Sequence, residues 1–513
     1  MAAVVTDQFR ILNADNFVNS VLDDNNSYYV FLGLSNPTAT GFGRDSNWET
    51  SIPSPTDNTQ YLNHYRDTAL FGRRITSENI RKVVRKVQWT SDINYDMYRH
   101  DYSVLNVTPN SGTTTLYNSD YYVITSDFRV YICLYNGSSG DKPQGSSSLY
   151  EPTGTDVQPV PYDDGYVWKY LFSISPNDVI KFDSTEYIVL PNNWSTSTDL
   201  QIADVRDAGD NNDQIKVVYI EDGGSGYTAG EYPILGDGSG ATVSITVDDS
   251  GAITSANIVT GGSDYTWAIV DLGRVGDTIS DPATLIPIIP PSRGHGYDIY
   301  TELGADRVLV YTRFDDSTKD FPVETKFAQV GILKNVSEYS DTGIGNTYTG
   351  STYSSLYSIK FGGDFPGGDP AVGSLMQQDR TIGGIKYEAK GYVASWDKDT
   401  KVLKYYRDRS LYFPNKVDQR DAINVGVGIG TTANVVDFVS EQLVTVVGVG
   451  ETSIDSSFNG TTFNGINLGV NFTAGLASPE INKKTGTIIY IDNRPEVERN
   501  LRQKEDIKII LEF

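Results

Sequence analysis

Short runs of alternating apolar residues, separated by glycine-rich turns, recur along almost the whole chain and constrain its fold most. The clearest example is a hairpin in which Gly391–Trp396 and Lys401–Tyr406 flank the turn residues Asp397–Thr400. A period of two is typical of a β-strand, and Gly, Asn and Asp favour the turns between strands. The composition agrees, with 48 Gly and 34 Tyr among 513 residues. We therefore predict a mainly β (α+β) protein of several sandwich-like or barrel-like modules with a few short helices.

An internal repeat marks residues 201–290. The segment Gly223–Thr228 recurs as Gly261–Thr266, and between the copies residues 243–247 alternate toward a turn at 249–251. Neither copy is followed by Lys-Ser/Thr or placed between a strand and a helix, so neither is a phosphate-binding loop. The pattern indicates a small β module with a two-fold internal repeat.

The rest of the chain alternates between strands and glycine-rich segments. The proline-rich residues 286–291 predict a stiff connector. Strands are expected again within 297–336, and residues 340–477 form another glycine-rich β region. Two further strands, 487–491 and 507–513, are expected at the C-terminal end, tied into a sheet.

The first 90 residues are the most helical part of the chain. Residues 16–22 place Phe17, Val18, Val21 and Leu22 on one face of a short helix, and a strand at 28–34 ends in the turn 35–37. A second helix is expected at 78–88, with Ser77 as its N-cap.

The opposite face of that second helix is basic. It carries Arg81, Lys82, Arg85 and Lys86 in a chain that is otherwise acidic. Two interpretations stay open. The pattern favours an ordinary solvated face, and the alternative is a docking surface for an acidic neighbouring subunit.

The net charge restricts the partners. With 41 Lys+Arg against 66 Asp+Glu, the formal charge is −25 at pH 7. Nucleic acids and anionic membranes repel such a chain, so we expect no nucleic-acid partner and no membrane insertion. The first residues lack the features of a signal peptide, and no apolar run approaches the length of a membrane span.

Residues that carry chemistry are scarce. The three histidines, His64, His100 and His295, are solitary, and His295 is expected at the surface or in a turn. Cys133 is the single cysteine and lies in a strand-like segment, which favours a buried packing role. We therefore expect no metal site, no cofactor and no catalytic residues, and we interpret the chain as a non-enzyme. The acidic segment 207–213 has the wrong spacing for calcium and is interpreted as a solvated loop.

Several blocks of the sequence resemble one known family. Asp163–Phe172 followed by Glu186–Pro191 is similar to a stretch of the baseplate wedge protein, the gene-eight product, of T-even-like contractile-tailed phages. Residues 489–495 and 505–513 resemble the end of that family, and residues 6–10 and 30–37 resemble its opening. Residues 327–333 resemble a fourth block. The resemblance covers roughly residues 1–200, 297–336 and 478–513.

The resemblance implies a division into domains. Residues 1–200, 291–339 and 478–513 would form a discontinuous core built from both ends of the chain. Residues 201–290 and 340–477 would be insertions into it. The family-motif residues with a structural role would be Asp164, Gly165, Tyr166, Trp168, Tyr187, Pro191, Tyr490, Asn493 and Pro495. Arg494 follows a strand in a turn-like segment and could bind a carboxylate through both nitrogens. Two interpretations stay open: an internal clamp, or a contact to a partner, in which case it joins the four basic residues above as a candidate interface residue.

The function implied by the resemblance is structural. The chain would be a bacteriophage virion protein of the tail baseplate, assembled in the host cytoplasm. It would form a homodimer within each wedge, bind other wedge subunits and relay the rearrangement of the baseplate on tail contraction. Two rival hypotheses stay open. One is a receptor-binding adsorption protein that recognises host surface glycan, and the other, ranked last, is a glycosidase acting on host polysaccharide.

Overall fold

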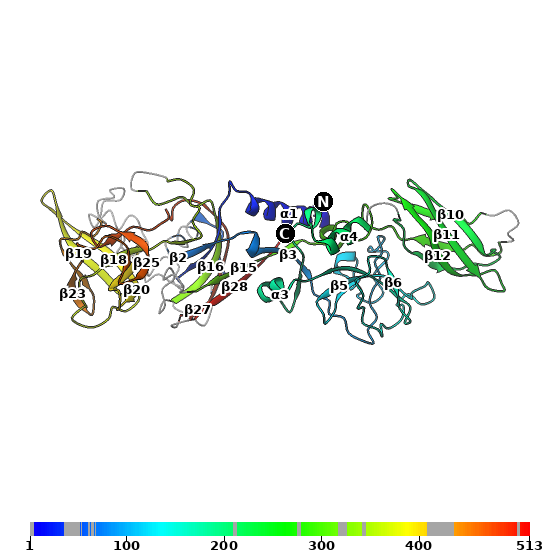
Figure 1. Cartoon of the computed structure of the whole chain (residues 1–513), viewed down its shortest axis with the longest axis horizontal. Coiled ribbons are helices and arrows are strands. Elements are labelled where there is room, and N and C mark those ends of the chain that lie inside the picture. Colours follow the sequence, from blue (N-terminus) through cyan, green and yellow to red (C-terminus); the bar gives the residue numbers. More distant parts are fainter. Residues whose placement is uncertain are drawn as a thin grey trace. The chain divides into compact units, whose positions relative to one another are not determined.

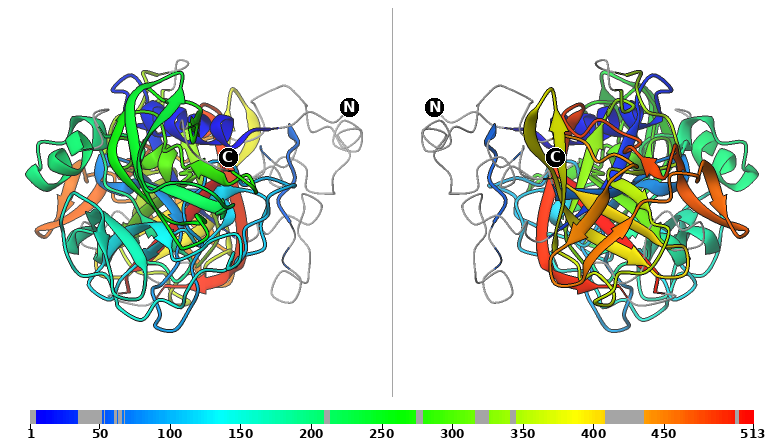
Figure 2. Two further views of the ribbon diagram at one scale, coloured as in Figure 1. Left: turned by 90° about the vertical axis from the view of Figure 1, so that its right-hand side faces the viewer. Right: turned by 90° about the vertical axis from the view of Figure 1, so that its left-hand side faces the viewer.

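The computed structural model describes the chain as two compact units. Unit 1 comprises Met1–Val18, Ile80–Val310 and Lys508–Phe513, and unit 2 comprises Asn19–Asn79 and Tyr311–Ile507. Strands dominate and the helices are few and short (Figures 1 and 2), so the predicted fold class is confirmed. The domain boundaries expected from the sequence stay a prediction. The residues described are 5–34, 52, 54–59, 62, 66, 68–208, 213–273, 279–315, 326–340, 345–407, 436–499 and 503–513.

The centre of unit 1 is a four-stranded antiparallel sheet with the order β4-β5-β7-β6. Its strands are β4 (Tyr122–Ile124), β5 (Arg129–Asn136), β6 (Val160–Pro161) and β7 (Tyr166–Ser173). Along β7, Tyr166, Trp168 and Tyr170 alternate with Val167 and Leu171, and the aromatic face that results is buried in the core of unit 1, where Trp168 is 1% exposed. Cys133 packs beside it and is fully buried, as predicted.

A second four-stranded sheet has the order β28-β15-β3-β8. Its strands are β3 (Ile80–Arg85), β8 (Tyr187–Val189), β15 (Arg307–Phe314) and β28 (Glu505–Glu512). The helix predicted at 78–88 is therefore wrong: Ser77–Asn79 forms one 3-10 turn and β3 follows. β3 pairs with β15 on one side and with β8 on the other. Its first five residues are all buried, which an inner strand covered on both faces allows and a surface helix does not.

Four helices are described in the chain. They are α1 (Asp7–Leu22), α3 (Pro176–Phe182), α4 (Leu200–Ala208) and α5 (Ile299–Glu302). α1 is longer than predicted, and its buried side is lined by Ile11, Ala14, Val18 and Val21. Leu22 is 38% exposed, so its predicted place on the buried face is wrong. No helix in the described ranges is long and apolar enough to span a membrane.

The predicted repeat has a structural counterpart within residues 213–289. Its main sheet has the order β12-β11-β10-β13 and its smaller sheet pairs β14 with β9. The strands are β9 (Val218–Asp222), β10 (Gly230–Gly236), β11 (Ser239–Val247), β12 (Ile253–Ser263), β13 (Ala268–Val270) and β14 (Thr284–Pro287) (Figure 1). The predicted connector at 286–291 begins inside β14, so that part of the prediction is wrong.

Both copies of the repeat adopt the same backbone. Gly224 and Gly262 have φ of 57° and 63°, and two residues later Gly226 and Asp264 are again left-handed. The tyrosine at the fifth position of each copy, Tyr227 or Tyr265, is buried. The Tyr227 hydroxyl accepts the Ala283 N–H and the Tyr265 hydroxyl accepts the Ala241 N–H. The repeat is therefore a pair of equivalent turns that seat two tyrosines in one small core.

Unit 2 holds a five-stranded sheet with the order β17-β2-β1-β16-β27. Its strands are β1 (Tyr28–Gly33), β2 (Ala69–Arg74), β16 (Lys326–Lys334), β17 (Thr352–Ser354) and β27 (Thr487–Glu498). The strands predicted at 28–34 and 327–333 are confirmed. The turn predicted at 35–37 lies outside the described residues. The turn-like segment 493–495 is instead part of edge strand β27, at a bulge opposite β16, where a proline without an N–H is tolerated.

A seven-stranded sheet completes the main framework of unit 2, with the order β23-β22-β19-β20-β21-β18-β26. The predicted hairpin at 391–406 is confirmed by the pairing of β20 with β21. A two-stranded sheet joins β24 to β25. The strands are β18 (Tyr357–Lys360), β19 (Leu375–Ile382), β20 (Ile385–Asp397), β21 (Val402–Tyr406), β22 (Leu443–Val446), β23 (Gly450–Ser453), β24 (Gly460–Phe463), β25 (Ile466–Phe472) and β26 (Leu476–Ala477).

Candidate functional site

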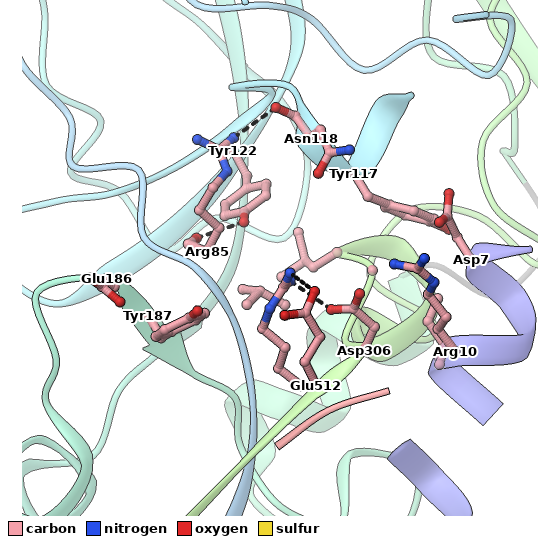
Figure 3. A pocket seen from close by; sticks show the side chains of 15 residues that line it. Asp7, Arg10, Arg85, Tyr117, Asn118, Tyr122, Glu186, Tyr187, Asp306 and Glu512 are labelled. Atoms are coloured by element: carbon pink, nitrogen blue, oxygen red, sulfur yellow. Dashed lines mark hydrogen bonds and ion pairs between the residues drawn. The ribbon is translucent and has the colours of Figure 1, made fainter. Parts of the chain in front are cut away.

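A polar cleft of about 470 Å³ opens in unit 1 (Figure 3). Its walls come from segments distant in sequence: the first turns of α1, the strands β3, β8 and β15, and Glu512 at the end of β28. Its volume lies within the range of ligand sites in proteins. Guanidinium groups, carboxylates and tyrosine rings alternate around it, so its chemistry is ionic and aromatic.

Arg307 holds together the floor of the cleft. Its Nη1 donates to an Asp306 carboxylate oxygen at 2.8 Å and its Nη2 donates to Glu512 at 2.6 Å. The guanidinium lies 5.9 Å from the centre of the Tyr187 ring. Burial raises the pKa of Asp306, and the adjacent Arg307 charge opposes that rise. This triad ties β15 to β28 at the point where the chain ends.

Arg85 is held on another wall. Its Nη2 donates to Asp120 at 2.6 Å and to the carbonyl oxygen of Ser119 at 2.8 Å. The Tyr122 hydroxyl donates to the Arg85 carbonyl oxygen at 2.7 Å, and burial raises the pKa of Tyr122 well above its ordinary value. Both side chains are therefore positioned by contacts within the chain.

The charged side chains on the wall formed by α1 are not held by ion pairs in the way that Arg85 and Arg307 are. Gln8 donates to the Tyr117 hydroxyl at 3.2 Å, and burial together with the Asp7 charge raises the pKa of Tyr117 to about 12. Figure 3 shows the Arg10 guanidinium extending from α1 on the side of Asp306. Among the residues that the structure describes, no hydrogen bond or ion pair engages the side chains of Asp7 and Arg10.

The lining contains no cysteine, histidine or serine. Within the described ranges, no group of three His, Cys, Asp or Glu side chains is placed to hold a metal ion. A cleft of charged groups and tyrosine rings is suited to binding through ion pairs, hydrogen bonds and cation–π contacts.

The four basic residues predicted from the sequence each have an acidic partner in unit 1. Arg81 pairs with Asp178 at 2.9 Å, Lys82 with Asp15, Arg85 with Asp120, and Lys86 with Asp183 at 3.3 Å. Arg81 and Lys82 are 7% and 8% exposed, so a solvated face is wrong for these two. Burial lowers the pKa of Lys82 to about 8. A contact with a neighbouring subunit through any of the four stays a prediction.

The first family motif forms a tight turn and the strand after it. The Asp164 carboxylate accepts the N–H groups of Leu149 and Tyr166, and Gly165 has a φ of 90° that favours glycine. The Tyr166 ring stacks on Trp168 at 5.3 Å. Tyr166 and Trp168 lie in the core, Gly165 is exposed, and none of these residues lines the cleft.

The second part of that motif reaches the cleft. Tyr187 lines it, whereas the Pro191 carbonyl oxygen accepts the Tyr300 hydroxyl at 2.7 Å elsewhere in unit 1. Of the residues predicted as sites, the structure therefore brings only Arg85 and Tyr187 together in the described cleft.

The C-terminal motif lies in unit 2, on β27. Tyr490 pairs in register with Ile332, and the buried Asn493 accepts from Gln329 at 3.1 Å. Arg494 has a side chain that is 66% exposed and pairs with Asp492 at 2.6 Å. Pro495 lies at the bulge. These residues stabilise an edge strand, and an interface role for Arg494 stays a prediction.

His295 does not lie at the surface. It is 6% exposed, in a turn, with Nδ1 at 2.6 Å from Glu302 and its ring against Tyr98. His100 accepts the Ile289 N–H at 3.2 Å through Nδ1, and His64 lies outside the described residues. Of the acidic segment 207–213, residues 209–212 also lie outside them, so its interpretation as a solvated loop stays a prediction.

Sequence reasoning missed most of the cleft. Asp7, Arg10 and Glu512 stand in the blocks that resemble the family at both ends of the chain, and that was the available signal. Tyr117, Asp306 and Arg307 stand in segments without a recognisable motif. The pairing of β15 and β28 in one sheet brings Arg307 and Glu512 together, and α1 supplies Asp7 and Arg10 from outside that sheet.

The fold and the cleft together define a β-rich protein of several sheets with a charged recess near both chain ends. A family model described as Bacteriophage T4, Gp8 matches residues 132–220. The baseplate wedge protein gp8 of Enterobacteria phage T4 is 26% identical over 209 residues, which are 37% of this chain and 60% of that protein. The chain thus spans less than two thirds of that relative. The two matches confirm the predicted resemblance, and over the matched part the chain is gene-eight-like.

Proposed function

We propose that this chain is a structural subunit of the baseplate wedge in a contractile phage tail. It resides in the tail baseplate of the virion and binds neighbouring wedge proteins. The observation that carries the proposal is the similarity to the T4 baseplate wedge protein, which includes the strands and turn of the first family motif. The lining of the cleft supports a binding role, since it offers ion pairs and aromatic rings.

The finer parts of the proposal concern assembly. The chain forms a homodimer within each wedge, joins other wedge subunits and relays the rearrangement of the baseplate when the tail contracts. A relay of this kind needs interfaces with two arrangements of similar free energy. The net charge of −25 gives the chain long-range attraction for basic partner surfaces.

Light scattering on the purified full chain tests this proposal. Alone, it is expected to have the mass of a dimer, and mixed with the other baseplate subunits of the same virus it should form a larger complex. Tail-tube subunits of the same virus serve as the control and should not join that complex. A chain that stays monomeric and binds no baseplate subunit would contradict the proposal.

A further inference from the structure

The charged groups of the cleft fall into two sets. Arg85 and Arg307 are neutralised within the chain, by Asp120 and by Asp306 with Glu512. Asp7, Arg10 and Glu186 form the second set, and no hydrogen bond or ion pair engages their side chains among the described residues. These three side chains are therefore available to an incoming group, whereas the two arginines of the first set already form ion pairs within the chain.

The balance of charge decides which group the cleft attracts. Four carboxylates line it, from Asp7, Glu186, Asp306 and Glu512, against three guanidinium groups. Asp120, which holds Arg85, adds a fifth carboxylate beside the lining. A cleft with an excess of negative charge lowers the energy of a cation and raises that of an anion.

The aromatic side chains of the cleft also favour a cationic ligand. Tyr117, Tyr122 and Tyr187 line the cleft, and the Tyr187 ring already lies beside one guanidinium, that of Arg307. The Tyr117 and Tyr122 hydroxyls are protonated at neutral pH, and burial raises the pKa of both groups further. Neutral tyrosine rings present electron-rich faces to cations and a hydroxyl that hydrogen-bonds at the rim.

We propose that the cleft binds a lysine or arginine side chain carried on a segment of a neighbouring baseplate subunit. Asp7 and Glu186 lie on opposite sides of the cleft in Figure 3, and one of these two carboxylates pairs with the incoming cation while the tyrosine rings enclose its aliphatic part. The volume of about 470 Å³ accommodates a few residues of an extended peptide. The proposal rests on the proposed function and names the surface through which that function is exerted.

Binding of short overlapping peptides from the other baseplate proteins of the same virus to the full chain tests the proposal. Peptides that bind should contain Lys or Arg, and replacing that residue by Ala should abolish binding. The double change Asp7→Asn with Glu186→Gln should weaken binding about tenfold, and high salt should reduce the difference. The control Asp141→Asn changes an exposed carboxylate outside the lining and should leave the affinity unchanged.

Arg10→Gln distinguishes a cationic guest from an anionic one. Removing this positive charge should leave a cationic peptide bound as tightly or more tightly. If Arg10→Gln abolishes binding while the Asp7 and Glu186 changes strengthen it, the guest is an anion and the proposal is overturned. It is also overturned if no peptide binds, or if binding is unaffected by all three changes.

The two proposals fail in different ways. If the chain joins the complex with baseplate subunits and the cleft variants join it equally well, the cleft is not the docking surface but the structural function stands. If the chain joins no complex at all, the proposed function fails and the cleft loses its partner. Circular dichroism of each variant should match the wild type, which excludes unfolding as the cause of a lost interaction.

Discussion

At the scale of single residues, buried cations are the notable feature of unit 1. Lys169 on β7 is 2% exposed, and its Nζ donates to the Val157 carbonyl oxygen at 2.5 Å. Burial lowers its pKa to about 8, and the negative charge of Glu302 opposes part of that decrease. The aromatic face of β7 was predictable from alternation, but a lysine on the opposite face predicts solvent there. Residues 294–297 and α4 cover that face instead, because Gly296 lies against Lys169 and Val205.

Lys169 should make stability depend on pH. Its pKa is lower in the folded state than in the unfolded chain, so the unfolded state binds more protons between about pH 8 and 10.5. The free energy of unfolding should therefore rise with pH in that window. From pH 7.5 to 9.5 this single group accounts for an increase of about 2 kcal/mol. Lys169→Met should remove that increase in urea denaturation, whereas the exposed Lys142→Met should retain it.

At the scale of elements, β3 shows how pairing overrides local pattern. The stripe of Ile80, Val83, Val84 and Val87 fits a helix as well as a strand, and the cations between them suggested a solvated face. In the structure, strands β8 and β15 flank β3, and its cations reach acidic residues on neighbouring elements. Arg81 contacts Asp178 at the start of α3 and lies over Phe182 at 5.0 Å. Sequence periodicity contains no information about such partners.

Breaking the buried pair should destabilise this layer of unit 1. Asp178→Ala leaves the Arg81 guanidinium, with a side chain 8% exposed, without its carboxylate, and should cost about 3 kcal/mol in urea denaturation. Asp183→Ala removes the partner of Lys86. The Asp183 side chain is 54% exposed, so this change should cost less than about 1 kcal/mol. Equal losses for the two variants would contradict the assignment of Arg81 as a buried, paired charge.

The repeat element allows a second test of local geometry. A Cβ at Gly262 would lie 2.5 Å from the Ser239 carbonyl oxygen, in a left-handed conformation. Gly262→Ala should therefore cost about 3 kcal/mol, from strain and from displacement of the facing strand. Gly224→Ala should behave alike, because its Cβ would lie 2.5 Å from the Asp281 carbonyl oxygen.

The matched control for the repeat is Gly112→Ala. Gly112 has a φ of 67°, but nothing lies within 4 Å of its Cβ position, so only the backbone strain of about 1 kcal/mol applies. Urea denaturation of the full chain measures the difference. If Gly262→Ala and Gly112→Ala lower the free energy of unfolding equally, the close approach of the two strands is not what requires glycine.

At the scale of the whole molecule, the two units divide the chain in a way that linear reading did not suggest. Unit 1 draws on both ends of the sequence together with residues 80–310. The discontinuous core expected from the family resemblance stays a prediction. The excess of 25 negative charges is a property of the whole chain, and the cleft carries the same sign locally. We expect both to favour basic surfaces on partner subunits.

The sequence by itself determined the fold class, the hairpin at 391–406, the equivalence of the two repeat copies and the burial of Cys133 and Trp168. Each depends on periodicity or turn chemistry between residues that are near neighbours in the chain. The tertiary structure alone decided that β3 is a strand, that His295 is buried, and that Asp7, Arg307 and Glu512 meet in one cleft. Those outcomes depend on which distant segments pair, and the free energy of pairing is set by packing across the sheet, which no local window contains.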